Sequence, residues 1–460
     1  MLVCINDKTM KRIIGIFLLL FASFGTFGQN IFDTKAAEMM NTQDWFALRT
    51  FLDKNGDSMN GFIRLCGTAL VHTYFNDSRA AVNNWNELLD QYDEMLDPNA
   101  KFGYNYLLMG AYEDTGDYEK GIDICDELLK TEGLDSLMSE HIRSIRNRMS
   151  GLVQFPEMRI VLSGPEASAQ LIGEDDLSCE MEWNGCPLPT LFDTGAQVSV
   201  LTEEMADRIG VRYVSADPLQ ATKNDLNLLC AVIDSLSVEG MVIYNMPVYV
   251  LKSRLEEVIE SQSDDPDVLS RYKEVRETAE KKMEQAVFGI PVMKRFARII
   301  FDIENRTVTF SMNVSDEKVG GSDFCLINNN LYLKYKLNGL DIISYMDTGM
   351  GGKGNLVLYN SYYQQNEDGL SPRVSDDTVT RGMLLPGRLL EYECFTVGPL
   401  RMEIGDKRCD LTGVEVLAGE GNVMAQIDPY PLSQGFLGFP AMKKMKRVIF
   451  DFARMRCLCE

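Results

Sequence analysis

The pattern of apolar and polar positions divides the chain into three parts. Residues 1–28 contain one long uninterrupted apolar run. In residues 30–152 apolar side chains recur at intervals of three and four, which predicts amphipathic helices joined by short turns. Beyond residue 155 the apolar runs are short and are separated by turn-forming residues, which predicts β-strands. We therefore expect an α+β multidomain chain in which an all-α part precedes an all-β part.

Residues 1–28 have the features of a secretory signal peptide. Lys11 and Arg12 precede the apolar run Ile13–Phe24, and small residues lie near Gly28. The run is shorter than the roughly 20 residues that cross a bilayer. We expect this segment to be removed and the product to be exported, to a periplasm or to the extracellular space, without a membrane attachment. An uncleaved membrane anchor is the alternative.

Residues 30–152 contain a helix pair with a recognisable spacing. One helix covers Tyr104–Tyr112, Gly116 ends it, and a second helix follows directly. Gly110 and Ala111 are small, so we expect the two helices to approach each other closely there. The pair resembles the tetratricopeptide type, in which stacked pairs share a core and present a concave face. The resemblance implies a surface for a protein partner; a plain helical bundle is the alternative.

Composition and charge exclude several kinds of function. The 460 residues include 68 Asp and Glu against 45 Lys and Arg, and the net charge of -23 argues against nucleic-acid binding. The two histidines, His72 and His141, fall in the helical part, where packed or solvated roles are expected. We therefore expect no His-based zinc site and no Ser-His-Asp triad, and no metal or cofactor of any kind. Acid–base chemistry would depend on carboxylates.

The eleven cysteines do not change this picture. Cys4 lies in the predicted signal peptide, and ten cysteines remain. Their spacing matches no metal-binding motif. Cys457 and Cys459 would share one face of a strand, which argues against a bond between them. The sequence assigns no disulfide.

The β part contains an internal repeat. Asn184-Gly185 precedes Asp193-Thr194-Gly195, and Asn338-Gly339 precedes Asp347-Thr348-Gly349 at the same spacing. An Asn-Gly pair between two β-rich runs is a strong signal for a two-residue hairpin. Each copy therefore predicts a hairpin whose second strand runs into an Asp-Thr-Gly triplet.

A second motif repeats downstream of each triplet. Val287–Gly289 is followed by Ile-Pro, and Phe436–Gly438 is followed by Phe-Pro. Each copy predicts a buried strand that ends at a glycine, a short helical turn, and a closing strand that ends in Asp302 or Asp451. Because both motifs recur in the same order, we expect two duplicated lobes.

Together these motifs resemble those of the aspartic proteases, the pepsin-like and retropepsin-like superfamily. The resemblance implies a bilobal all-β fold, with lobe 1 in residues 155–312 and lobe 2 in residues 322–460. It implies an endopeptidase that hydrolyses a polypeptide in the cleft between the lobes, where Asp193 and Asp347 form the catalytic pair that activates a water molecule. The residues expected to support this pair are Thr194, Gly195, Ala196, Thr348, Gly349 and Met350.

Further segments are expected around this site. Hairpins that cover the cleft are predicted within residues 213–232, with the tip at 222–225, and within residues 378–394. Residues 252–286 are predicted to be a helical insertion in lobe 1, because apolar residues recur at helical spacing after a helix start at Asp265-Pro266. The insertion either packs on the outside of the lobe or forms a lid.

Met350 motivates an alternative function. A hydroxyl residue at its position would help to hold the second carboxylate, and the stretch from Gly351 onward is richer in glycine than Val198–Leu201 of lobe 1. The alternative is a catalytically weak or inactive protease-like scaffold that binds peptides or proteins.

Overall fold

The computed structural model describes residues 30–214, 219–221, 226–251, 284–314, 320–351, 355–375, 377–385, 388–419 and 428–460. They form two compact units. The helical unit extends to Glu157 and includes Pro429–Leu432, and the β unit comprises Met158–Asp428 and Ser433–Glu460. The predicted signal peptide, the first hairpin tip at 222–225 and residues 252–283 of the predicted insertion lie outside the described residues. The last residue of that insertion, Ala286, belongs to a strand.

The helical unit confirms the helical prediction for this part of the chain. Its helices are α2 (Ile31–Asn41), α3 (Trp45–Asn55), α4 (Gly61–Tyr74), α5 (Ser78–Tyr92), α6 (Pro98–Thr115), α7 (Tyr118–Leu128) and α8 (Ser136–Leu152). Most of them begin after an Asn or Asp whose side chain accepts a hydrogen bond from a backbone N–H group of the first turn, as Asn60 does for α4 and Asp135 for α8. Gly116 ends α6 in the left-handed conformation, as the sequence predicts.

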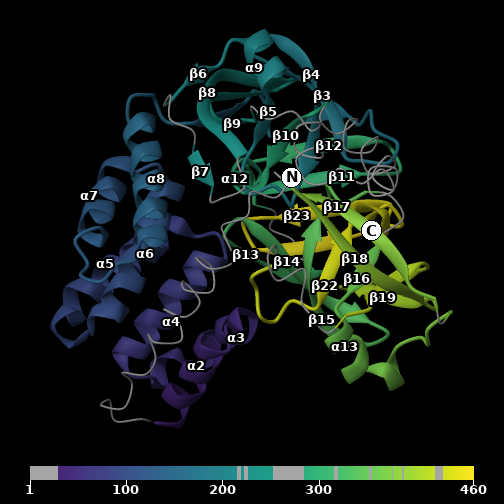
Figure 1. The fold of residues 1–460 in the computed structure, drawn as a ribbon, viewed down its shortest axis with the longest axis horizontal. Coiled ribbons are helices and arrows are strands. Elements are labelled where there is room, and N and C mark those ends of the chain that lie inside the picture. Colours follow the sequence, from purple (N-terminus) through teal and green to yellow (C-terminus); the bar gives the residue numbers. More distant parts are fainter. Residues whose placement is uncertain are drawn as a thin grey trace. The chain divides into compact units, whose positions relative to one another are not determined.

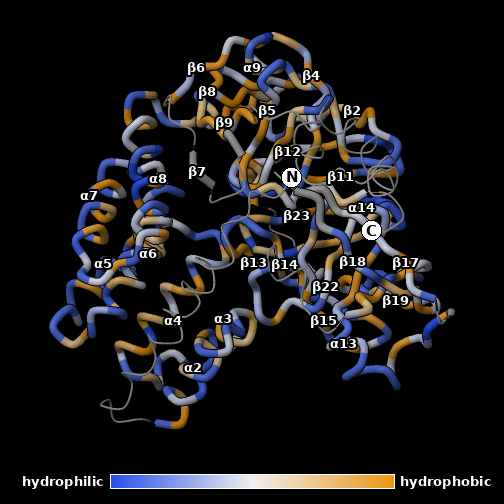
Figure 2. The backbone as a smooth tube through the Cα atoms, in the orientation of Figure 1, coloured by the Kyte–Doolittle hydropathy of each residue, from blue (hydrophilic) through white to orange (hydrophobic). Residues whose placement is uncertain are grey.

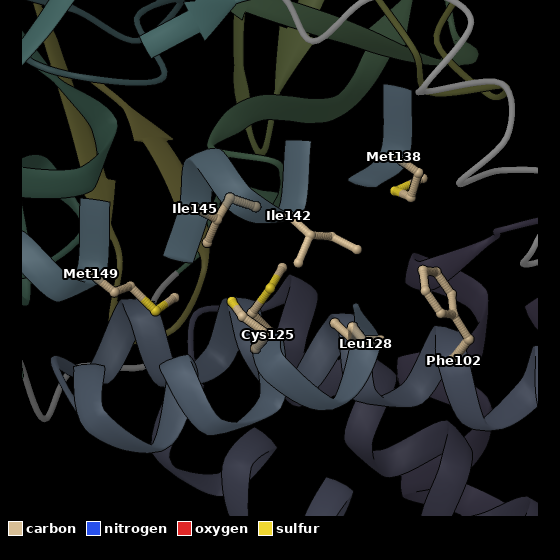
Figure 3. Packing of buried hydrophobic residues seen from close by; sticks show 8 residues of the cluster. Phe102, Cys125, Leu128, Met138, Ile142, Ile145 and Met149 are labelled. Atoms are coloured by element: carbon tan, nitrogen blue, oxygen red, sulfur yellow. The ribbon is translucent and has the colours of Figure 1, made fainter. Parts of the chain in front are cut away.

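Consecutive helices pack on one another around buried apolar side chains. Figure 3 shows one such cluster, in which α8 faces α6 and α7. Its members are Phe102, Met109, Cys125, Leu128, Met138, Ile142, Ile145 and Met149. The apolar spacing of three and four therefore places one face of each helix in a common core.

The close-packed glycine of this region is not the predicted one. Gly110 is exposed, and a Cβ built on it would meet no atom within 4 Å. On α7, by contrast, a Cβ on Gly121 would lie 2.5 Å from Met149 Sδ of α8. The prediction of a close approach was wrong at Gly110, because the rotation of α6 turns this residue to solvent, whereas the neighbouring Ala111 is buried.

The β unit contains two sheets (Figure 1). The first follows the order β1 (Arg159–Leu162), β9 (Met241–Leu251), β5 (Val200–Thr202), β10 (Ala286–Gly289), β4 (Cys186–Asp193), β3 (Ser178–Trp183), β8 (Leu226–Val238) and β6 (Arg212–Tyr213), and β7 (Leu219–Ala221) pairs with β8. Hydrophobic residues predominate along β8 and β9 (Figure 2). These strands therefore carry much of the core of this half.

The second sheet joins strands from both halves of the unit. Its order is β17 (Val379–Leu385), β18 (Arg388–Val397), β21 (Val414–Leu417), β16 (Leu356–Leu358), β22 (Gly435–Gly438), β15 (Leu340–Asp347), β14 (Asn330–Leu337), β13 (Ser322–Ile327), β24 (Arg456–Cys459), β23 (Arg447–Asp451), β11 (Arg298–Asp302), β12 (Thr307–Ser311) and β2 (Glu166–Gln170). The closing strands of the two downstream motifs, β11 and β23, pair antiparallel to each other. They connect the half that carries the first triplet to the half that carries the second.

Both Asn-Gly pairs form the predicted hairpins. Asn184 and Gly185 have φ angles of 49° and 78°, and Asn338 and Gly339 have φ angles of 50° and 84°. Two successive positive φ angles are typical of the type I′ turn, whose twist matches that of the adjoining strands. The hairpins β3–β4 and β14–β15 thus each direct one strand toward an Asp-Thr-Gly triplet.

Within the described residues, no helix has the length and apolarity that would be needed to cross a membrane.

Candidate active site

The two triplets lie at equivalent places in the two halves of the β unit. Asp193 is the last residue of β4, and Asp347 is the last residue of β15. Each strand runs parallel to the strand of a downstream motif, with Asp193 opposite Gly289 and Asp347 opposite Gly438. The two motifs that repeat in the sequence therefore meet in space.

In the first half, the downstream glycine leaves room for the turn that follows the triplet. A Cβ on Gly289 would lie 2.5 Å from the carbonyl oxygen of Val198 and 2.8 Å from that of Ala196. The next residue then donates its N–H to the turn: Ile290 to the Ala196 oxygen at 3.0 Å, and Phe439 to the Met350 oxygen at 3.1 Å. Ala196 and Met350 thus hold the same main-chain position.

Each carboxylate packs against the glycine of the other triplet. A Cβ on Gly195 would lie 2.5 Å from Cγ of Asp347, and a Cβ on Gly349 would lie 2.5 Å from Cγ of Asp193. Real Cβ contacts are never this short, so only glycine fits at either position. The structure thus brings both predicted carboxylates together with both predicted glycines.

The two threonines form a reciprocal hydrogen-bond network between the halves. The Thr194 N–H donates to Thr348 Oγ1 at 2.9 Å, and the Thr348 N–H donates to Thr194 Oγ1 at 3.0 Å. Each hydroxyl then donates to a carbonyl oxygen of the opposite strand, Thr194 to Met346 at 2.8 Å and Thr348 to Phe192 at 2.7 Å. Both threonines are buried, so this network fixes one triplet relative to the other.

Backbone N–H groups also orient the carboxylates. Gly195 donates to Asp193 Oδ1 at 2.8 Å, and Met350 donates to Asp347 Oδ1 at 2.9 Å. Met350 therefore supports the second carboxylate through its main chain, although its side chain offers no hydroxyl. The exposed fraction is 1% for Asp193 and 9% for Asp347, so the second carboxylate is the more accessible of the two.

Sequence reasoning missed three polar residues that contact this site. The Tyr345 hydroxyl donates to the Gly195 carbonyl oxygen at 3.0 Å and lies 3.3 Å from Asn330 Oδ1. Gln197 Nε2 donates to the same Asn330 oxygen at 2.9 Å. For Tyr345 and Gln197 the signal in the sequence is their position near the triplets, two residues before Asp347 and four residues after Asp193. Asn330 has no such signal.

The two histidines belong to the helical unit, on helices α4 and α8. His72 Nδ1 lies 2.6 Å from Asn84 Oδ1, and His141 Nε2 lies 2.8 Å from the Tyr106 hydroxyl. Burial lowers the pKa of His141 to about 4, with a further contribution from the nearby Arg148 charge. His141 is therefore neutral near pH 7.

Metal-ligand clusters and cysteine thiols are two further places where reactive chemistry could occur. Within the described residues, no group of three or more His, Cys, Asp or Glu side chains could hold a metal ion. The ten described cysteines are free thiols. Burial raises the pKa of Cys125, Cys179 and Cys394 to about 12, so these groups are protonated near neutral pH and are poor nucleophiles.

One comparison with known proteins, a family model, points in the same direction as the sequence motifs. A family model described as aspartyl protease matches residues 179–269, which include the first triplet. Among solved structures, a retropepsin-like aspartic protease from Rickettsia conorii matches with 14% identity and a TM-score of 0.20, covering 34% of this chain and 95% of that one. A search of curated proteins gave no match. The family match supports a general relationship to the aspartic protease superfamily.

Proposed function

We propose that this protein is an exported aspartic endopeptidase with two duplicated lobes, in which Asp193 and Asp347 form the catalytic pair. The observation that carries the proposal is the reciprocal packing of each carboxylate against the glycine of the other triplet. The threonine network supports it, because it ties the two triplets together through four hydrogen bonds. The aspartyl protease family match adds support for the first half.

The chemistry follows from the behaviour of two adjacent carboxyl groups. Two carboxylates held close together cannot both ionise easily, so they share one proton and titrate as a pair. The ionised member acts as the base that activates a water molecule, and the protonated member donates to the carbonyl oxygen of the scissile amide. A proton is then transferred to the leaving amine, and hydrolysis is completed without a covalent bond between the substrate and the protein.

The proposed substrate is a polypeptide in the cleft between the lobes. Strands β7 and β8 pair within the first predicted covering hairpin, and β17 and β18 pair within the second. We assign these two hairpins to substrate contact because each lies between a triplet and its downstream motif in the chain. No cofactor is needed for this reaction.

The experiment measures cleavage of a reduced and alkylated polypeptide by the purified full-length chain. Asp193→Asn and Asp347→Asn each remove one carboxylate with little change in shape, and both should lower hydrolysis by at least about 1,000-fold. Asp341→Asn is the matched control, since Asp341 is an exposed residue of the same strand β15, and it should keep wild-type activity. Undiminished cleavage by either Asp193→Asn or Asp347→Asn would refute the proposal.

Met350 keeps a second candidate function open, a protease-like scaffold that binds peptides without cleaving them. Its side chain lacks the hydroxyl that would add a bond to the second carboxylate. This alternative predicts peptide binding with no turnover at any pH from about 3 to 8, the range over which such a pair would titrate.

For the helical unit we propose either a docking role, which its resemblance to tetratricopeptide pairs implies, or the role of an inhibitory pro-region. Deletion of residues 30–152 distinguishes the two roles. An inhibitory unit predicts higher hydrolysis after deletion, and a docking unit predicts unchanged hydrolysis with loss of a bound protein. The proposed export predicts that a secreted product begins shortly after residue 28, which N-terminal sequencing checks.

A further inference from the structure

The turn at Gly195 is held from the opposite half of the β unit by a buried tyrosine. Tyr345 lies on β15, its side chain is fully buried, and its hydroxyl lies 3.0 Å from the Gly195 carbonyl oxygen. A tyrosine has one hydroxyl hydrogen to donate. Asn330 Oδ1 is more distant, at 3.3 Å, and already accepts the Gln197 amide. The Gly195 oxygen is therefore the principal acceptor.

Gly195 contacts both carboxylates, and its position therefore sets how they lie relative to each other. Its N–H donates to Asp193 Oδ1, and its Cα faces the Asp347 carboxylate so closely that no Cβ fits between them. A small rotation of this residue would lengthen the first contact and change the second. The Tyr345 bond fixes the carbonyl end of the same residue, so it restrains both contacts at once.

Different residues stand at the three positions that correspond to Tyr345, Gln197 and Asn330 in the internal repeat. The residue two before Asp193 is Leu191, which has no hydroxyl to donate, and the residue four after Asp347 is Gly351, which has no amide side chain. The position of Asn330 is taken by Asp176, whose carboxylate accepts from Ser178 and Gln285 instead. The side chains at these three positions therefore differ between the two halves.

We propose that Tyr345 is a positioning residue, which holds the Gly195 turn and thereby the relation between the two carboxylates. The inference rests on the proposed function. Asn330 and Gln197 contribute indirectly, because the Gln197 amide donates to Asn330 Oδ1 and so competes with the tyrosine hydroxyl for this second acceptor. Tyr345 touches neither reacting carboxylate through this bond, so its effect is on geometry and on the protonation of the pair.

The test compares kcat, KM and the pH dependence of peptide hydrolysis for the full-length wild type and Tyr345→Phe. We expect kcat to fall about tenfold, because catalysis is sensitive to small displacements of reacting groups, with KM changed by less than about twofold. The acidic limb of the pH profile should move to higher pH. A weaker N–H bond stabilises ionised Asp193 less and so raises the pKa of the pair.

Tyr335→Phe is the matched control. Tyr335 is another buried tyrosine of the same sheet, and its hydroxyl lies 3.0 Å from Ser344 Oγ. It should show unchanged kcat and an unchanged acidic limb. The same unchanged values for a folded Tyr345→Phe would overturn the inference.

Gln197→Leu provides an independent variant should Tyr345→Phe fail to fold. Gln197 is partly exposed, and its loss frees Asn330 Oδ1 to compete for the tyrosine hydroxyl. We expect a shift of the acidic limb in the same direction with a loss of kcat of about threefold, and an unchanged profile would overturn the inference. If Asp193→Asn and Asp347→Asn also retain hydrolysis, the proposed function itself fails; if they abolish it, only the role of Tyr345 is lost.

Discussion

The two halves of the candidate site share their main-chain geometry but differ in their side-chain support. In each half an aspartate ends a strand opposite a glycine, accepts a backbone N–H, and faces the glycine of the other triplet. The Tyr345 hydroxyl of the second half donates to Gly195 of the first half, and the Gln197 amide of the first half donates to Asn330 of the second half. At the corresponding positions, Leu191 of the first half replaces Tyr345, and Gly351 of the second half replaces Gln197. Asp347 is also the more exposed carboxylate.

The comparison distinguishes two kinds of feature: the main-chain geometry that both halves share, and the side-chain contacts of Tyr345 and Gln197 that differ between the halves. The shared features use small residues and backbone groups, because two segments of the chain must approach within contact distance around the carboxylates. The contacts that differ use larger side chains at the periphery. Substitutions in the shared features should therefore act equally in both halves, whereas substitutions in the contacts that differ should not.

The largest effect is expected from the triplet glycines. Gly195→Ala and Gly349→Ala each insert a methyl group where a Cβ would lie 2.5 Å from a carboxylate carbon. Because the carboxylate must move, hydrolysis should fall by about 100-fold or more in both variants. Gly110→Ala is the control, since its Cβ meets open space, and it should leave activity unchanged. Full activity in only one of the two triplet variants would contradict the claim that Gly195 and Gly349 have equivalent roles in the two halves.

The threonines should show the next largest effect, this time on stability. Thr194→Val and Thr348→Val each delete a hydroxyl that donates to one buried backbone group and accepts from another. Leaving these groups unsatisfied should lower the free energy of unfolding by about 2–4 kcal/mol, measured by urea denaturation. Thr309→Val, which removes an exposed bond to Ser168, should have a much smaller effect. Losses that differ by more than about 1 kcal/mol between the two triplet threonines would contradict the reciprocal network.

Much of this geometry could be predicted from local sequence signals. The Asn184-Gly185 and Asn338-Gly339 turns require positive φ angles that Asn and Gly adopt easily, so both hairpins follow from four residues. Each hairpin leads into a strand that ends at the Asp of a triplet, β4 at Asp193 and β15 at Asp347. This was predictable because only a short, regular strand separates each turn from its triplet. The end of α6 at Gly116 was predictable for the same reason.

The contacts between distant segments could not be predicted in this way. Tyr345 and Gly195 are 150 residues apart in the chain, and no periodicity or turn signal relates them. Glycine packing depends likewise on how a helix is rotated: Gly110 is exposed, whereas Gly121 lies against Met149. Side-chain identity alone does not indicate which of two glycines faces a neighbour.

His141 predicts a pH effect on stability that must be separated from the activity of the site. Its folded-state pKa of about 4 lies below the usual value of 6.5, so the unfolded chain binds more protons between these values. The free energy of unfolding should therefore fall as the pH falls from 6.5 to 4, by up to about 3 kcal/mol.

His141→Gln checks this effect, because it keeps a polar group near Tyr106 but cannot titrate. Urea denaturation at several pH values should show a shallower dependence for this variant than for the wild type. The pH dependence of hydrolysis at the candidate site should be the same in His141→Gln and in the wild type. An identical pH dependence of unfolding in His141→Gln would show that the buried histidine does not cause the effect.

The central claim, that the two carboxylates act as one catalytic unit, is tested most directly by a double-mutant cycle on hydrolysis. The measurement is kcat/KM for Asp193→Asn, Asp347→Asn and the variant that carries both substitutions. If the pair works as a unit, the double variant loses about as much activity as either single variant, because each single change already removes the mechanism. Losses that multiply in the double variant, or a single variant that retains wild-type hydrolysis, would contradict the claim.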